Sequence, residues 1–160
     1  VAHTRVECTS VVGVGSGLGF YTLVGAQESA LTDGIYSYAR PGVTDVQMRG
    51  ADGLTLEALE TLGGETVRIT GENLGASRTG EAVTAFYGPS ASEFEAVGSC
   101  IVVEEHHVFD CTTNEGVGAG HVWSVVVGGL TSSASTARTR YKEPVITGLS
   151  GSGTTKANTA

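Results

Sequence analysis

The chain has 160 residues, 24 of them glycine, and a formal net charge of −8 at neutral pH. This composition, rich in glycine and hydroxyl side chains, argues against a helical bundle, and the acidic balance argues against nucleic-acid binding. No apolar run approaches the roughly 20 residues that a membrane-spanning helix needs. We therefore expect a globular all-β protein with no membrane span in this segment.

The sequence repeats itself at an offset of 103 residues. Between residues 8 and 44, 12 of 37 aligned columns are identical, several of them glycine. The aligned pairs include Cys8 with Cys111, Tyr38 with Tyr141 and Pro41 with Pro144. The offset predicts the C-terminal half of one unit at 1–40, a complete unit at 41–143 and the first strand of a third unit at 144–160. A proline at each join stiffens the connection, so we expect neighbouring units to meet at a restricted angle.

Short strands follow one another through the complete unit, separated by turn residues. They are predicted at 43–48, 66–70, 82–87, 99–103, 108–112, 121–127 and 137–142. A turn at 72–75 should fold Leu74 back onto the core. Seven short strands in about 100 residues predict a β-sandwich.

Residues 49–63 interrupt this pattern between the first two strands. Leucine and alanine recur there at helical spacing, which allows a helix of one or two turns. We expect the segment either to cover one end of the sandwich or to protrude toward a partner.

Three cysteines raise the question of pairing. If the chain reverses at 105–106, Val103 faces Val108, Val102 faces Phe109 and Cys100 faces Cys111. The separation of the two cysteines then suits a disulfide. We predict this bridge, with a pair of buried thiols as the alternative. Cys8 then lacks a partner: either its partner precedes this segment, or it is free or bonded to another chain.

The segment GGETVRITGENLG at 63–75 resembles the signature of the IPT/TIG family of immunoglobulin-like modules. Pro41, the cysteine pair, the glycines after Cys111 and Tyr141 follow in the family's order, and the flanking pieces repeat the same elements. The segment at 49–63 is longer than is usual in the family. The resemblance implies immunoglobulin-like sandwiches in tandem.

The sequence contains no recognisable pattern of catalytic residues. Glu104, Glu105, His106 and His107 form the one dense group of metal ligands, but neighbours on an extended strand point to opposite faces, so we interpret the group as a solvated hairpin tip. The glycine-rich segments match neither the nucleophile elbow nor a nucleotide-binding loop. We expect no enzymatic activity, no metal and no cofactor.

The strand at 121–127 is apolar on both faces. Trp123, Val125 and Val127 should face the core. On the opposite face Val122, Ser124 and Val126 correspond to Gly19, Tyr21 and Leu23 of the first copy. We therefore take Tyr21, Leu23, Val122 and Val126 as candidates for an interface with a neighbouring unit or chain; the alternative is coverage by the unit's own loop. Candidate sites for O-linked sugar are Thr131, Ser132, Ser133, Ser135 and Thr136.

A disulfide in a glycine-rich sandwich implies an oxidising, extracellular compartment. We expect a structural protein whose tandem modules bind neighbouring copies in a fibrous or appendage-like assembly at the cell surface. In a variant of this hypothesis, the tail from Pro144 adds a strand to another subunit. The alternatives are an adhesive or ligand-binding receptor ectodomain of the plexin kind, which would bind a protein ligand, and an accessory module of a carbohydrate-active enzyme.

Overall fold

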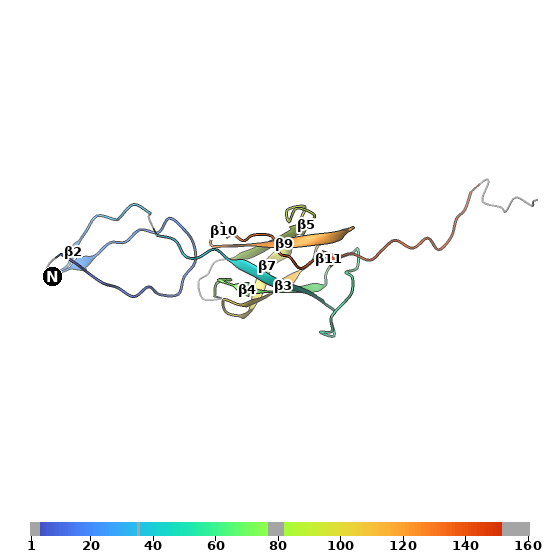
Figure 1. The fold of residues 1–160 in the computed structure, drawn as a ribbon, viewed down its shortest axis with the longest axis horizontal. Helices are drawn as coiled ribbons and strands as arrows, with labels where there is room; N and C mark the ends of the chain where they lie inside the picture. Colours follow the sequence, from blue (N-terminus) through green and yellow to red (C-terminus); the bar gives the residue numbers. More distant parts are fainter. Residues whose placement is uncertain (1–3, 35, 77–81, 152–160) are drawn as a thin grey trace, which may run out of the picture.

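The computed structural model describes residues 4–34, 36–76 and 82–151. Its secondary structure is all β, with antiparallel sheets, and no helix in the described ranges is long and apolar enough to cross a membrane. Figure 1 shows three parts in a row: an open hairpin region at the N-terminal end, the packed sheets in the middle, and an extended segment that leads away after β11. The all-β prediction is confirmed.

Two antiparallel sheets enclose the core between residues 42 and 141. One sheet has the order β3-β4-β8-β7; the other has the order β10-β9-β5-β6, with β11 also paired to β9. The strands of the first sheet are β3 (Gly42–Arg49), β4 (Thr66–Glu72), β7 (Val97–Glu104) and β8 (Val108–Thr112). Those of the second are β5 (Val83–Gly88), β6 (Phe94–Glu95), β9 (Ala119–Val127), β10 (Leu130–Thr131) and β11 (Thr139–Arg140). Outside them, β1 (Leu23–Val24) and β2 (Gln27–Glu28) form a hairpin.

Strand alternation explains the core. Val67 and Ile69 of β4 are fully buried, and so are Trp123 and Val125 of β9, as the period-two pattern predicts. Leu74 is also fully buried, because the turn after β4 folds it inward as expected. Side chains from both sheets thus form one apolar cluster, the arrangement of a β-sandwich.

Two local expectations need correction, and two short strands were not predicted. Residues 49–63 contain turns and isolated bridges instead of a helix, and Leu59 enters the core. The predicted strand at 137–142 shortens to β11. Strands β6 and β10 were not predicted, because two-residue strands carry no periodicity.

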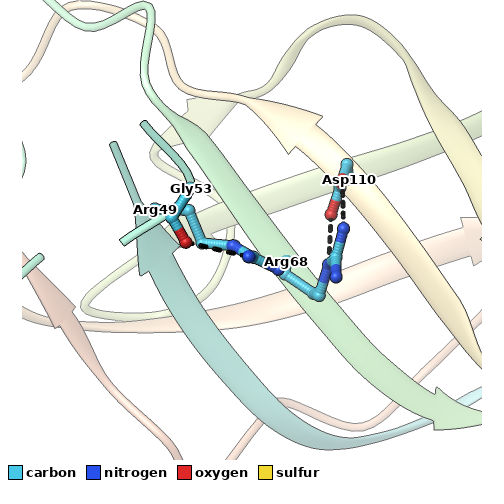
Figure 2. Close-up of polar contacts among 4 residues, drawn as sticks. All are labelled: Arg49, Gly53, Arg68 and Asp110. Carbon is cyan, nitrogen blue, oxygen red and sulfur yellow. Dashed lines mark hydrogen bonds and ion pairs between the residues drawn. The ribbon is translucent and has the colours of Figure 1, made fainter. Parts of the chain in front are cut away.

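Segment 49–63 partly covers the sandwich and partly protrudes. Leu59 donates its backbone N–H to Arg140 and accepts from Lys142, at 2.8 and 2.7 Å, so the segment is attached beside β11. Leu54 at the tip is exposed, and the Arg49 guanidinium donates to the Gly53 carbonyl at 2.8 Å to close this tip (Figure 2). One end of the segment therefore covers the sandwich and the other end protrudes, and partner binding at the tip stays a prediction.

The hairpin β7–β8 carries the predicted disulfide. Cys100 and Cys111 are bonded, with their Cα atoms 4.4 Å apart. Val102 pairs with Phe109 as expected, but Glu104, not Val103, pairs with Val108, because the register shifts between these pairs. The bridge joins neighbouring strands of one sheet, whereas the bridge of antibody domains joins the two sheets.

The outer face of this sheet carries an ion pair across β4 and β8. The Arg68 guanidinium donates to both carboxylate oxygens of Asp110, at 2.8 and 2.7 Å (Figure 2). The two residues are direct cross-strand partners, so the pairing register places opposite charges side by side.

Candidate functional site: the joint between the hairpin region and the sandwich

Residues 11–34 and 36–38 fold like their counterparts in 114–141, at the offset of 103. Tyr38 donates its backbone N–H to Gly15 at 2.9 Å, and Tyr141 donates to Gly118 at the same distance. The turn glycines Gly25 and Gly128 have φ angles of 56° and 54°. The two segments therefore share their hydrogen bonds and their turn conformation, although few of their side chains are identical.

Hydroxyl groups serve as backbone partners along one edge of β9. Val125 donates its N–H to Ser132 Oγ at 3.0 Å, and Trp123 donates to Ser135 Oγ at 2.9 Å. In return, the Ser132 N–H donates to the Val125 carbonyl and the Ser135 N–H donates to the Trp123 carbonyl. The corresponding bonds in the first copy run from Thr22 to Ser29 and from Phe20 to Thr32. A side chain thus replaces a ladder partner at matched positions in both copies.

The hairpin region meets the sandwich with almost no linker. Pro41 is buried immediately before β3. The Asn73 amide donates to the Arg40 carbonyl at 3.3 Å, and the Arg40 guanidinium donates to the Thr131 carbonyl at 3.4 Å. These bonds attach the join to the turn after β4 and to strand β10.

Glycines allow the close approach at this joint. A Cβ on Gly128 would lie 2.8 Å from the Gly15 nitrogen and 2.8 Å from a Val14 methyl group, and one on Gly75 would lie 3.2 Å from Val14. Gly15, Gly75 and Gly128 all have positive φ angles, which glycine adopts without strain. Val14 consequently packs between the turns at 75 and 128, against the edge of the core.

The opposite end of the sandwich carries the same sequence feature, and no second sheet of the described chain lies against it. Val117 lies between Gly116 and Gly118, as Val14 lies between Gly13 and Gly15. Val117 is 68% exposed, beside Pro144 and Val145 in a shallow pocket. The Gly-Val-Gly triplet of the joint therefore recurs at the other end of the sandwich, where its valine is largely exposed.

His121 lies in the core between aromatic rings. Its ring centroid is 5.6 Å from those of Phe94 and Tyr141 and 6.2 Å from that of Tyr87, each in an edge-on arrangement. Neither ring nitrogen has a hydrogen-bond partner among the described residues. The equivalent residue in the first copy is Leu18, so this position accepts an apolar side chain.

The four interface candidates separate into two groups. Tyr21 and Leu23 are exposed, at 58% and 64%, whereas Val122 is buried and Val126 half-buried within the chain itself. Between the two valines, the Ser124 hydroxyl donates to Ala91 at 3.1 Å. A loop of the same chain thus contacts this face of β9 at Ser124, and an interface at the four candidates stays a prediction.

The loop that contains Ala91 is closed by the carboxylate of Glu93. Glu93 accepts hydrogen bonds from the Ser90 hydroxyl and from the Ser90 and Ser92 backbone N–H groups. The bond from the Ser90 hydroxyl, followed by these backbone bonds, lowers the pKa of Glu93 to about 2. Glu93 is therefore ionised at neutral pH and keeps these hydrogen bonds.

Two of the five glycosylation candidates need correction. Ser132 and Ser135 are buried, and their hydroxyls donate to Ser133 and Ala137 carbonyls while accepting from β9. A sugar on either hydroxyl would break these bonds. Thr131, Ser133 and Thr136 are exposed, so O-linked sugar at these three stays a prediction.

The remaining polar candidates do not come together. Cys8 is a free, exposed thiol. Within residues 4–34, 36–76 and 82–151, no three side chains of His, Cys, Asp or Glu are grouped as a metal site. The tip at 104–107 is not simply solvated: His106 donates its backbone N–H to Gly75 at 2.6 Å, and His107 accepts from Gly71 at 2.8 Å. These two hydrogen bonds hold the turn at 71–75, in which Gly75 lies next to Val14.

No family model matches the chain, and no curated protein matches it either.

The residues of the joint were not predicted from the sequence. The aligned glycines were recognised, but the valine between them was not. The recurring Gly-Val-Gly triplet at 13–15 and 116–118 was the available signal.

Proposed function

We propose that this chain is a segment of an extracellular, non-enzymatic structural protein made of tandem IPT/TIG-like units of immunoglobulin type. Its units are 1–40, the C-terminal half of one; 41–143, a complete one; and 144–160, the first strand of another. Neighbouring units or chains are its partners, and the assembly is a fibrous or appendage-like structure at a cell surface.

The joint carries this proposal. Val14 and Gly15 pack against Gly75 and Gly128 of the following sandwich, and Arg40 bonds to that sandwich directly. The same triplet recurs at the far end around Val117. A head-to-tail contact that uses different surfaces at its two ends leaves a surface free for the next unit, and it builds an open filament where the rotation between units does not close a ring.

The disulfide supports the extracellular part of the proposal, since such bridges persist in oxidising compartments. Electron microscopy of the native material is the direct experiment. Long regular filaments are the expected result, with a repeat that matches one sandwich per 103 residues. Isolated particles in the native material would contradict the fibre.

A second candidate function is an adhesive or ligand-binding receptor ectodomain. The observation that favours it lies on edge strand β7, where Val97, Ile101 and Val103 are 53%, 70% and 49% exposed. An aliphatic stripe on a free edge suits a protein ligand that adds a strand. Binding of a cell-surface protein that is lost in Ile101→Lys, with filaments absent, would favour the receptor over the fibre.

A further inference from the structure

The hairpin region exposes the face that its counterpart buries. Phe20 is 51% exposed and Val24 is 70% exposed, whereas their equivalents Trp123 and Val127 are 0% and 2% exposed. Phe20 is held edge-on against Tyr36, with ring centroids 4.6 Å apart. The same hydrogen bonds shape both hairpins, so the difference lies in what covers them.

The complete unit shows what covers such a face. Strand β5 pairs with the second edge of β9, for example Tyr87 with Trp123, and the sheet β3-β4-β8-β7 closes the core above. In the described part of the chain, β1 pairs with β2 alone. Tyr21 precedes β1 and Leu23 begins it; both are exposed, and no described strand pairs with the other edge of β1.

Cys8 corresponds to a residue of the other sheet of the sandwich, β3-β4-β8-β7. It is the equivalent of Cys111, which is bonded to Cys100 eleven residues earlier. Cys8 lies on the rim of a groove that Val6, Phe20, Tyr21 and Tyr36 also line. The free thiol and the exposed apolar face therefore adjoin each other.

We propose that this face binds the front half of a repeat unit, a polypeptide with the pattern of residues 41–106. That polypeptide adds a β5-type strand along Tyr21 and Leu23, covers Phe20 and Val24, and supplies a cysteine that bonds to Cys8. In this step the two thiols lose their hydrogens and form one S–S bond, while a small disulfide such as oxidised glutathione is reduced to two thiols. The inference rests on the tandem arrangement proposed above.

The test extends the full chain by its own sequence. Residues 41–106 are placed directly before Thr4, so that the added Cys100 stands eleven residues before Cys8, as in the complete unit. The chain is oxidised with a glutathione redox buffer, and its disulfides are mapped by mass spectrometry. Hydrogen exchange is followed at 19–24, with 122–127 in the same molecule as the internal reference for correct folding.

The expected result is a bond between Cys8 and the added Cys100, with exchange at 19–24 slowed about 100-fold relative to the unextended chain. The extended chain with Cys8→Ser should keep part of this protection, because the apolar face still docks. The extended chain with Phe20→Asp should lose it, since a charge would then enter the new core.

Two results would overturn the proposal. One is a free Cys8 with unchanged exchange at 19–24 while 122–127 stays protected. The other is an unextended chain that dimerises through Cys8 with 19–24 protected, which would assign the face to a second copy. Neither depends on filaments in the native material, so failure of this inference is distinguishable from failure of the proposed fibre.

Discussion

The Tyr141 hydroxyl donates a hydrogen bond of 2.7 Å to the carbonyl oxygen of Asn114, and the Tyr141 ring lies over Gly116. Tyr38 makes the same bond to Val11, also at 2.7 Å, over Gly13. This tyrosine therefore closes the turn before β9 and the matching turn in the first copy. In the complete unit it also bonds to the hydroxyl of Tyr87 inside the core.

Alkaline pH should destabilise the sandwich through Tyr141. Burial, and then the hydrogen bond with Tyr87, raise the pKa of Tyr141 well above its ordinary value. A raised pKa favours the neutral phenol in the folded state, so its contribution is fully present below pH about 10 and is lost as the pH rises above that value. Denaturant unfolding between pH 7 and 11 measures this loss.

Tyr141→Phe is the matched variant for this pH dependence. It should lose about 1–2 kcal/mol at pH 7, because the Asn114 carbonyl and the Tyr87 hydroxyl lose a partner. Its free energy of unfolding should then fall less steeply above pH 10. An equally steep fall in the variant would show that another group causes the alkaline loss.

Gly128→Ala should loosen the joint. The new Cβ would meet Gly15 and Val14, so the hairpin region must move away from the sandwich. Gly25→Ala is the control, since Gly25 has nearly the same φ angle and no atom within 4 Å of a Cβ. Both variants should lose about 1–2 kcal/mol from backbone strain.

Only Gly128→Ala should change the spatial relation of the two parts. Small-angle X-ray scattering should show a broader distribution of molecular lengths for that variant, while Gly25→Ala should scatter as the parent chain does. Identical scattering from the two variants would show that the glycine contact does not hold the joint.

His121→Leu should stabilise the sandwich by about 1–2 kcal/mol. The two ring nitrogens of His121 are buried without a partner among the described residues, and leucine removes this penalty with a side chain that stands at the aligned position 18. Thermal unfolding at pH 7 checks the change. Leu18→His is the control: this residue is 36% exposed, so the reverse change should shift stability little. A lower melting temperature for His121→Leu would indicate that the histidine has a bound partner.

Loss of the disulfide should destabilise the sandwich by about 3 kcal/mol. The bridge closes a short loop, and its absence restores chain entropy to the unfolded state. The double variant Cys100→Ala with Cys111→Ala tests this by denaturant unfolding. Cys8→Ser should leave the unfolding midpoint unchanged, because Cys8 is exposed and unbonded. Equal stability of the double variant and the parent chain would contradict a structural role for the bridge.

Ser132→Ala and Ser135→Ala should each lose about 1 kcal/mol, because each leaves a β9 N–H without its acceptor. Ser133→Ala, at an exposed position, should have no measurable effect. In material from a glycosylating host, peptide mapping should find sugar only at Thr131, Ser133 or Thr136. A glycan on Ser132 or Ser135 would contradict the buried position of their hydroxyls.

Several features were predictable because they depend on neighbours in the sequence. The alternation of Val67 and Ile69 determines one face of β4, and the spacing of Cys100 and Cys111 around a reversal places them opposite each other. The recurrence of glycine at 25 and 128 likewise requires the same turn conformation in both copies, because a positive φ is a local property.

Contacts between distant segments were decided by tertiary structure alone. Ser132 and Ser135 looked like an exposed polar turn, yet their hydroxyls replace backbone partners of β9. Val122 looked like an interface residue, yet it is buried within the chain, close to Ser124, whose hydroxyl bonds to Ala91, 33 positions away. The physical reason is that a residue type and its spacing restrict local backbone conformation, whereas burial depends on which remote segment packs there, and the contact of Val14 with Gly128 is visible in neither local sequence.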